Sequence, residues 1–506
     1  MKPTLVWAEM AACSGCSVSL LDNYHDVMSL LSNFDIKYDT IICDGKKIPD
    51  EVDLTIIEGG CAVTKKEIDF VRSLRAKSKV LVSIGACAAT GGILNYAEGN
   101  QMPMPELDAF LPIHDVVEID YAILGCPPAP EAIAKFLSAY LNKDLSYLLP
   151  FKTTIGKSEE KIRSIVKNGL CVSCGLCGAT CPTKAIRFVE GKPVIRDERC
   201  VFCGECYFQC PRSFISFSAS ETKVIGDYLE YMSLRSTLKR VKNKAQSGGT
   251  VTSLFAYALD NKILDGVIVA KKSEENIWLG DPIVVTDSDE LYETAGTKYS
   301  VCPILYPLKE AITTYGISKL GIVGVPCQHQ ALKKLDDYPV GIRHVSAKIA
   351  LKVGLFCTSN FRYNAMTKLV EELGEIRPED INKIDISAGT FNIYSRLGEV
   401  IKLPLKVVHD YEQESCRICN DFTSEFADVS VGSLGSPDNW STVIIRNEKG
   451  REIVNGAIEE GYLIRKDMKE EEIDIVRKLS GIKKKKACSF LDMRQEYGLM
   501  LPFFSE

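Results

Sequence analysis

The chain has 506 residues, of which 46% are hydrophobic and 25% are charged, and its formal net charge is −6. One hydrophobic core stops growing well below this length, so we expect about three domains. The slightly acidic balance excludes the basic footprint of a nucleic-acid-binding protein, and no run reaches the roughly 18 apolar residues of a membrane-spanning helix, so any membrane association would need a partner.

Residues 1–150 alternate short apolar runs with amphipathic segments, which predicts a flavodoxin-like, doubly wound α/β domain around a parallel sheet. The expected strands are Leu5–Trp7, Thr40–Cys43, Leu54–Glu58, Val80–Ile84 and Ala122–Leu124. The expected helices are Ser19–Leu31, Lys65–Ala76 and Glu131–Tyr140. In such sheets a site forms beyond the carboxyl ends of the strands, where the loops converge.

Cysteines follow the strands of this domain in loops of small residues. Cys13 and Cys16 stand in one loop, Cys87 in a second and Cys126 in a third. Small neighbours leave room for a bulky inorganic cluster, whereas an isolated buried cysteine packs as a small apolar side chain. We therefore expect these four cysteines to bind metal. Cys61 could replace one of them or lie beside the site as a thiol.

A charged linker over about 151–165 leads to an internal repeat with an offset of 29 residues. Each copy reads Cys-x2-Cys-x2-Cys-x3-Cys-Pro, a run that wraps a [4Fe–4S] cubane and sends its fourth cysteine to the other cluster. Zinc knuckles need four ligands in one closed site and leave the duplication unexplained. We assign one cluster to Cys171, Cys174, Cys177 and Cys210, and a second to Cys200, Cys203, Cys206 and Cys181.

The chain has 20 cysteines, and its first residues do not resemble a signal peptide. Disulfide scaffolds are short and exported, so this number in a long chain indicates metal thiolates in a reducing, cytoplasmic compartment. Outside the clusters, Cys43, Cys302 and Cys488 are expected to be buried core residues.

From about residue 222 to 506 apolar strand-like runs again alternate with helix-like, charged segments, which predicts a third, α/β domain. The expected strands are Gly266–Ala270, Ile283–Thr286, Leu320–Val325 and Ile349–Leu355. Two cysteines end strands and two form a Cys-x-x-Cys pair, a set that suits one further [4Fe–4S] cluster: Cys327, Cys357, Cys416 and Cys419. The lysine run 483–486 is expected to be a solvated helix face rather than a site for an acidic ligand.

Three loops of small polar residues are candidates for a phosphate-bearing cofactor. The glycine loop, residues 246–250, precedes a helical segment, Val251–Leu259. Glycines let the backbone approach a phosphate and a helix start offers unpaired N–H groups, although a simple turn explains such a loop equally well. The candidate contacts are Ser247, Gly248, Gly249, Thr250, Gly296, Thr297, Lys298, Tyr299, Ser433, Gly435 and Ser436.

Residues from about 5 to 215 resemble the gamma (small) subunit of [NiFe] hydrogenases, in particular of the type that reduces coenzyme F420 (an 8-hydroxy-5-deazaflavin; the name is not a residue label). The resemblance rests on the loops 13–16, 85–92 and 125–128 and on the repeat, with residues 211–214 after it. It implies that Cys13, Cys16, Cys87 and Cys126 hold the proximal [4Fe–4S] cluster, the one nearest the partner's active site.

Residues from about 225 to 505 look like the beta subunit of the same hydrogenase, an FAD-containing family shared with F420-linked dehydrogenases. The match includes residues 433–440 and 497–499, and it makes the four C-terminal cysteines cluster ligands. It implies bound FAD, with coenzyme F420 as substrate, at the glycine loop and the 296–300 loop. Cations for the acidic coenzyme tail and candidate proton carriers, each also explicable as surface or structural residues, are Lys298, Arg362, Arg396, Lys402, Lys406, His329 and His409.

The expected domains are therefore a hydrogenase-small-subunit-like domain (1–150), a linker with a two-cluster ferredoxin (151–221), and a flavin and cluster domain (222–506). A flavin holds one or two electrons, so it can join hydride transfer to one-electron carriers. The resemblance thus implies an oxidoreductase subunit that exchanges hydride between coenzyme F420 and FAD and relays single electrons through four [4Fe–4S] clusters.

The catalytic partner stays open, because the chain lacks a second cysteine set for nickel and iron. A [NiFe] hydrogenase large subunit is the default. The fusion of two modules also suits an electron-transfer subunit bound to a nickel CO dehydrogenase, a formate dehydrogenase or a disulfide reductase. Of a different class is a pure electron carrier without hydride chemistry. A nicotinamide-dependent enzyme lacks support, since no strand–Gly-x-Gly-x-x-Gly–helix unit is evident.

Overall fold

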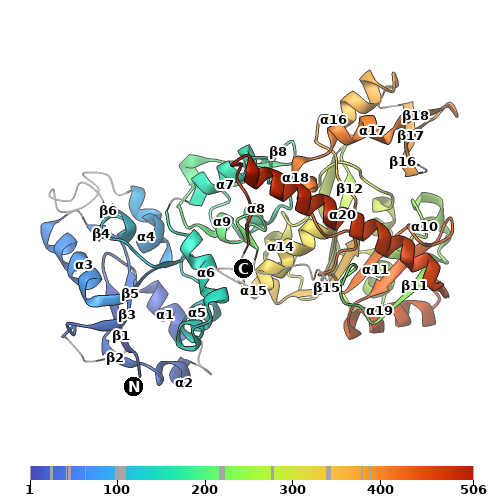
Figure 1. The fold of residues 1–506 in the computed structure, drawn as a ribbon. Coiled ribbons are helices and arrows are strands. Elements are labelled where there is room, and N and C mark those ends of the chain that lie inside the picture. Colours follow the sequence, from blue (N-terminus) through green and yellow to red (C-terminus); the bar gives the residue numbers. More distant parts are fainter. Residues whose placement is uncertain are drawn as a thin grey trace.

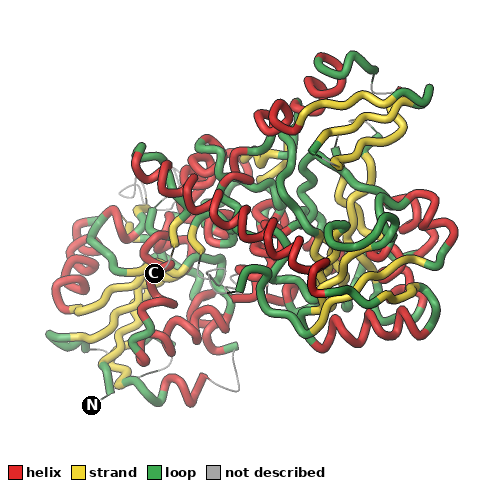
Figure 2. The backbone as a smooth tube through the Cα atoms, turned by 45° about the vertical axis from the view of Figure 1, so that its right-hand side comes forward, coloured by secondary structure: helices red, strands yellow, loops and turns green. Residues whose placement is uncertain are grey.

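The computed structural model describes residues 2–22, 27–41, 43, 47–62, 64–96, 110–156, 158–215, 223–274, 279–337, 343–377, 380–387 and 389–504. Two sheets lie at opposite ends of the molecule, with a small cysteine-rich module between them (Figures 1 and 2). Among the described helices, none combines the length and the apolarity that crossing a bilayer requires.

The N-terminal domain is built on a five-stranded parallel sheet in the order β2-β1-β3-β5-β7. This is the flavodoxin-like order, with its switch point between the first and third strands, and it confirms the expected parallel α/β fold. The strands are β1 (Thr4–Glu9), β2 (Asp35–Tyr38), β3 (Val52–Glu58), β5 (Ser78–Ile84) and β7 (Tyr121–Ile123). The connecting helices are α1 (Gly15–Leu21), α2 (Val27–Leu31), α3 (Lys65–Lys77), α4 (Gly85–Thr90) and α5 (Pro130–Asn142).

Two expected elements of this domain are placed differently. The second strand precedes the expected Thr40–Cys43, because the Asp39 carboxylate accepts the Ile41 N–H at 2.6 Å and turns the chain there. As an edge strand whose side chains are all half-buried, β2 carries no apolar run. The single helix expected over 19–31 is divided into α1 and α2.

The cysteine-rich module follows α6 (Leu145–Thr153) and α7 (Ser158–Lys167). Its elements are α8 (Leu176–Thr180), β8 (Ile186–Val189), β9 (Lys192–Ile195), α9 (Glu205–Phe208) and β10 (Phe214–Ile215), which pairs with β22 (Phe503–Phe504). Gly204 opens α9 with a φ of +80°, and a Cβ there would lie 2.4 Å from the Leu124 side chain. The module is therefore packed directly on the N-terminal domain.

The C-terminal domain contains an eight-stranded mixed sheet in the order β13-β12-β14-β15-β19-β20-β11-β21, and its centre, β12-β14-β15-β19, is parallel. All four expected strands are present. The strands are β11 (Glu230–Ser236), β12 (Gly266–Lys272), β13 (Gly280–Val285), β14 (Leu320–Gly324), β15 (Ile349–Leu355), β19 (Val429–Gly432), β20 (Ser441–Ile445) and β21 (Leu463–Lys466). Its main helices are α10 (Lys239–Lys244), α11 (Thr250–Asp260), α13 (Leu308–Thr313), α14 (Pro326–Asp337) and α19 (Glu448–Glu459).

A small subdomain is inserted between β15 and β19 and projects at the upper right of Figure 1. Phe361, Leu369, Phe391 and Val408 form part of its own core. The sequence did not separate it from the rest of the domain. Its elements are α16 (Ala365–Thr367), β16 (Ile381–Ser387), β17 (Thr390–Ser395), β18 (Val400–Pro404) and α17 (Leu405–Val408).

The long helix α20 (Glu470–Glu496) crosses from the C-terminal domain to the cysteine-rich module (red in Figure 1). Its lysine run was expected to be solvated, and that expectation is wrong for the first two members. Lys483 and Lys484 turn inward because they continue the buried face of the helix, where Lys484 lies 2.8 Å from the buried Glu425 carboxylate. Cys488 was expected in the core but is exposed.

Candidate cluster and cofactor sites

Four cysteines of the N-terminal domain meet at the carboxyl edge of its sheet. Cys13 and Cys16 follow β1, Cys87 lies in α4 after β5, and Cys126 follows β7. Burial raises the pKa of Cys16, and the other three thiols add to that effect. Gly85 leaves room beside them, since a Cβ there would lie 2.4 Å from the Cys16 sulfur. The structure thus brings together the four loop cysteines that the sequence singled out.

Glu58, the last residue of β3, positions the first of these loops. Its carboxylate is 2% exposed and accepts hydrogen bonds from the N–H groups of Cys16 at 2.9 Å and Ser17 at 3.0 Å. The Ser17 hydroxyl donates at 2.6 Å and the Trp7 indole at 3.3 Å. A buried carboxylate requires such donors, and they hold the start of α1 against the end of the sheet.

Cys61 lies apart from this set. It belongs to β4 (Cys61–Ala62), which pairs with β6 (Phe110–Leu111), and it is fully buried. Burial, and then the charge of Glu67 on α3, raise its pKa to about 11. The geometry therefore favours the buried thiol among the two roles that the sequence left open.

The eight cysteines of the repeat form two sets, and each set draws on both halves of the repeat. Burial dominates the raised pKa values of Cys177 and Cys206, and the thiols of their own set add to it. The first set is Cys171, Cys174, Cys177 and Cys210. The second set is Cys200, Cys203, Cys206 and Cys181, around a hollow that the buried Glu205 also lines. The crossed assignment expected from the spacing is the one that the fold brings together.

A second hollow lies among the four C-terminal cysteines. Cys327 stands in the first turn of α14, Cys357 follows β15, and Cys416 and Cys419 stand in and just after α18 (Glu414–Arg417). Lys483 lines the same hollow from α20, where its ammonium donates to the carbonyls of Cys357 at 2.6 Å and Asp421 at 2.8 Å. Cys302, buried as expected, also lines it.

The chemistry of these sets suits metal–sulfur sites. None of the 20 cysteines forms a disulfide, and backbone N–H groups donate to cysteine sulfur, from Ala185 to Cys181 at 3.1 Å and from Asn360 to Cys416 at 3.3 Å. Among the described residues, no group of three or more His, Cys, Asp or Glu is close enough to hold a single metal ion.

The four sets lie in a row through the molecule. On one side, Thr90 donates to the Phe202 carbonyl, which joins α4 to the second set of the repeat. On the other side, Leu305 donates to the Cys174 carbonyl at 2.9 Å, and Val172 lines the C-terminal hollow. The cysteine-rich module therefore connects the N-terminal set to the C-terminal set.

The three polar loops proposed for a cofactor come together at one end of the eight-stranded sheet. The Ser247 hydroxyl donates to the Trp440 carbonyl at 2.6 Å, which joins the glycine loop to the segment after β19. A Cβ on Gly296 would meet only the Lys244 carbonyl, at 3.6 Å, so the second loop lies beside the first. The Ser436 hydroxyl, in the third loop, completes a hydrogen-bonded chain with two hydroxyls of β11 and β20.

The members of the glycine loop differ in what they offer a ligand. Gly248 packs against the sheet, because a Cβ there would lie 2.6 Å from the Leu234 carbonyl, and Thr250 is 1% exposed. Gly249, with a φ of +71°, begins α11 without a side-chain cap. Burial lowers the pKa of Lys298 to about 8. An uncapped helix start, hydroxyls and a lysine suit a phosphate-bearing cofactor.

The inserted subdomain lies against these loops. The Gln246 side chain donates to Asp385 of β16 at 2.9 Å, and the ring of Tyr299 meets the edge of Phe391 with centroids 6.4 Å apart. Apart from Lys298, the cations considered for the coenzyme tail all stand in this subdomain, at Arg362, Arg396, Lys402 and Lys406. The insertion therefore carries four of the five cations that the sequence offered for the coenzyme tail.

The two histidines considered as proton carriers occupy different settings. His329 is fully buried, its Nε2 lies 3.1 Å from the Val353 carbonyl, and burial lowers its pKa to about 4. It is a structural histidine. His409 is exposed at the edge of the subdomain and contacts Glu412 at 2.6 Å.

Sequence reasoning missed charged residues beside the cysteine sets, among them the buried Glu58 and Arg212 and the half-buried Lys483. Lys483 had a detectable signal, because it falls in helical register with the apolar Ile473 and Val476. Glu58 and Arg212 had none, since each becomes buried only when another segment packs on it.

Comparisons with known proteins match separate parts of the chain. Four family models match: "NADH ubiquinone oxidoreductase, 20 Kd subunit" at 13–140, "4Fe-4S dicluster domain" at 170–214, and "Coenzyme F420 hydrogenase/dehydrogenase, beta subunit" N-term at 231–309 and C terminus at 317–471. The chain is 44% identical to the coenzyme F420 hydrogenase subunit beta of Methanococcus voltae over 55% of this chain and 99% of that one.

The N-terminal part has a separate relative. The coenzyme F420 hydrogenase subunit gamma of Methanococcus voltae is 37% identical over 36% of this chain and 84% of that one. Among solved structures, a chain of the F420-reducing [NiFe] hydrogenase complex from Methanosarcina barkeri matches with a TM-score of 0.53 and 38% identity, over 55% of this chain and 97% of that one.

Proposed function

Since the chain belongs to the coenzyme F420 hydrogenase/dehydrogenase family of F420 oxidoreductases, as a beta subunit fused behind a gamma-like one, we propose that it is the electron-transfer subunit of an F420-linked enzyme complex. In this function, hydride is exchanged between coenzyme F420 and a bound FAD, and single electrons pass through four [4Fe–4S] clusters to or from a catalytic partner. A bound flavin supplies the exchange between two-electron and one-electron chemistry.

The observation that carries the proposal is the row of four cysteine sets. Each set offers four thiols, two of the sets surround a hollow, and backbone N–H groups are directed at their sulfurs. The proposed ligands are Cys13, Cys16, Cys87, Cys126, Cys171, Cys174, Cys177, Cys181, Cys200, Cys203, Cys206, Cys210, Cys327, Cys357, Cys416 and Cys419. A purely structural role for cysteines would not require a continuous row between two α/β domains.

The chain's own residues prepare the two ends of this row. At one end, Glu58 fixes the loop of Cys13 and Cys16. At the other end, the uncapped start of α11 and the hydroxyls near Ser436 suit the FAD pyrophosphate, and Lys298 with the cations of the inserted subdomain suits an acidic coenzyme tail. The ring contact between Tyr299 and Phe391 holds the 296–300 loop against the core of the inserted subdomain.

The test is anaerobic mixing of the reconstituted chain with reduced coenzyme F420. We expect the flavin to bleach first and the cluster absorbance to follow. Protein that is fully loaded with iron but binds no FAD, and whose clusters stay oxidised, would instead identify a pure electron carrier. Two cysteine variants form a matched pair. Cys416→Ser should remove about four irons per chain, whereas Cys488→Ser, which changes an exposed cysteine of α20, should remove none.

The partner is identified by purifying the native complex through this chain. A [NiFe] hydrogenase large subunit with nickel and iron is our first expectation, because the gamma-like module carries its proximal cysteine set. A nickel CO dehydrogenase or formate dehydrogenase in its place would mean that the gamma-like module transfers electrons from or to a substrate other than hydrogen.

A further inference from the structure

The contact between the cysteine-rich module and the C-terminal domain contains a deeply buried arginine. Arg212 follows Cys210 and Pro211 and is 2% exposed. Its backbone N–H donates to the Cys210 sulfur at 3.4 Å. Its side chain crosses the contact, where Nη1 donates to the Gln330 side chain at 3.2 Å. The residue thus touches elements that carry two different cysteine sets.

Helix α14 builds the other wall of this junction. Cys327 stands in its first turn, and Gln330 and Lys334 follow at spacings of three and four residues, so the three lie on one helix face. Lys334 donates to the Ser213 hydroxyl at 2.6 Å and to the Cys210 carbonyl. One helix therefore offers a ligand of the C-terminal set and two anchors for the end of the cysteine-rich module.

The guanidinium at this junction is incompletely paired. Arg212 Nε and Nη2 are buried and have no hydrogen-bond partner among the described residues. Arg446, buried to a similar degree, donates to five oxygens. A buried guanidinium keeps its charge and needs acceptors, so donors left over at a cysteine set indicate an acceptor that the described part of the polypeptide does not supply.

The charge of Arg212 reaches both neighbouring sets. Burial raises the pKa values of Cys174 and Cys210 of the first set of the repeat and of Cys327 of the C-terminal set, and the Arg212 charge opposes that rise at all three thiols, together with Lys334 at Cys210. Arginine remains charged at all relevant pH values, so this field is permanent. In a buried site of low effective dielectric constant such a field is weakly screened.

We propose that Arg212 sets the reduction potentials of the two clusters that meet at this junction and donates hydrogen bonds to cluster sulfur on its free side. The inference rests on the proposed function. Each transfer moves one electron from one cluster to the other, with no bond made or broken, and leaves the acceptor more negative by one unit. A fixed positive charge stabilises that reduced form, so these two clusters accept electrons more readily than they would without it.

The consequence is a relay with an asymmetric energy profile. Electrons arriving from either end are held at the junction next to the flavin domain, where two one-electron steps can accumulate before a two-electron transfer. Arg212 is a positioning residue in this scheme, because it acts through the clusters and touches no substrate.

The test is a redox titration, followed by electron paramagnetic resonance, of the full reconstituted chain and of three variants. Arg212→Gln removes the charge and should shift two cluster potentials to more negative values while leaving the others unchanged. Arg212→Lys keeps the charge, so both cluster potentials should stay close to those of the unmodified chain. Arg187→Gln removes an exposed arginine from β8 of the same module and should leave every potential as in the unmodified chain.

Iron and sulfide analysis accompanies each titration. If Arg212→Gln does not load its clusters, Gln330→Glu answers the same question, because it leaves Arg212 in place and neutralises its field through the bond that Gln330 already accepts. It should also shift both potentials to more negative values. Unchanged potentials in the loaded variant overturn the inference. An unmodified chain without iron at the C-terminal set would overturn the proposed function instead, which is a separate outcome.

Discussion

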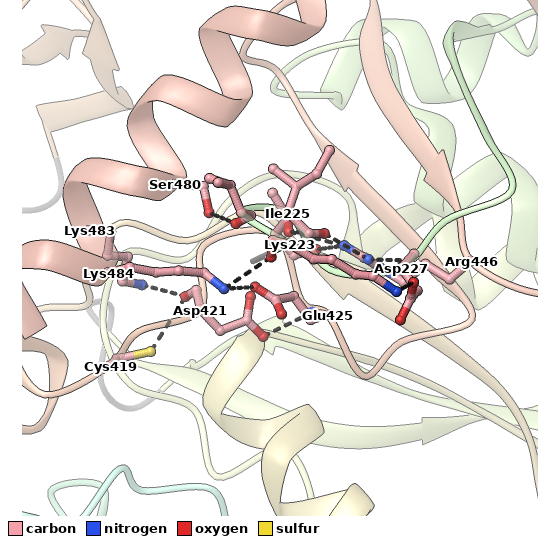
Figure 3. A network of polar contacts seen from close by, with 12 residues as sticks. Lys223, Ile225, Asp227, Cys419, Asp421, Glu425, Arg446, Ser480, Lys483 and Lys484 are labelled. Carbon is pink, nitrogen blue, oxygen red and sulfur yellow. Dashed lines mark hydrogen bonds and ion pairs between the residues drawn. The ribbon is translucent and has the colours of Figure 1, made fainter. Parts of the chain in front are cut away.

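Arg446 at the end of the buried strand β20 is the residue whose removal should most damage the C-terminal domain. Its guanidinium is 8% exposed and donates to the Ser430 hydroxyl at 2.7 Å, to the carbonyls of Ile225 at 3.0 Å and Asp227 at 2.9 Å, and to the carbonyl and hydroxyl of Thr423, each at 3.0 Å (Figure 3). It therefore joins β20 to the segment before β11 and to the turn after the cysteine pair.

The change Arg446→Met keeps the volume and removes every one of these bonds. It leaves buried carbonyls without donors, and it leaves the carboxylates of Asp421 and Glu425 with less positive charge beside them. Removing one partner from a buried charged network costs about 3–5 kcal/mol. At about 1.4 kcal/mol per tenfold, that is a factor of roughly 10² to 4 × 10³ in the opening equilibrium.

Hydrogen exchange measured by mass spectrometry on peptides that cover β20 and β11 reads this equilibrium locally. Faster exchange by two orders of magnitude or more is expected in the variant, with the N-terminal domain unaffected. Arg451→Met is the matched control, because Arg451 forms exposed ion pairs with Glu230 and Glu448 and should change little. Exchange in Arg446→Met within about threefold of the unmodified chain would refute the assignment of a structural role to this network.

Three further predictions concern Glu58, Lys298 and Glu425. Glu58→Gln turns an amide donor toward the N–H groups of α1, so the variant should lose the proximal cluster signal and about 1–3 kcal/mol of stability in the N-terminal domain, measured by urea unfolding. The Michaelis constant for coenzyme F420 should rise as pH passes above about 8, because Lys298 loses its charge there. The Lys298→Arg variant should abolish that rise. A variant with the same pH profile as the unmodified chain would contradict the role of Lys298. Burial, and then Asp421, raise the pKa of Glu425 from 4.5 to about 7, so the folded chain binds this proton more tightly than the unfolded chain. Stability should therefore fall as pH rises from 4.5 to about 7 and level off above it, and Glu425→Gln should flatten that part of the profile in thermal unfolding.

Local patterns in the sequence anticipated much of the fold. The parallel sheet of the N-terminal domain was predictable because its central strands are buried on both faces and appear as apolar runs. The edge strand β2 was missed because all its side chains are half-buried. The inserted subdomain was missed because its strands alternate apolar and polar residues over short lengths that also suit loops.

The cysteine sets were predictable to different extents. In the repeat, ligand spacing is local, so the crossed assignment of Cys181 and Cys210 follows from the chain alone. In the C-terminal domain, Cys327, Cys357 and the pair at 416 and 419 are far apart along the chain, and only the strand order of the sheet brings them around one hollow.

By itself, the sequence determined which cysteines are candidate ligands and how they divide into sets, because thiol spacing and small flanking residues are local chemical requirements. The tertiary structure alone decided how the sets adjoin and which charges stand between them. Arg212 and Glu58 have no local signature of electrostatic importance comparable to a cysteine motif. Their effect comes from burial, which removes water from around a charge only after distant segments have packed together.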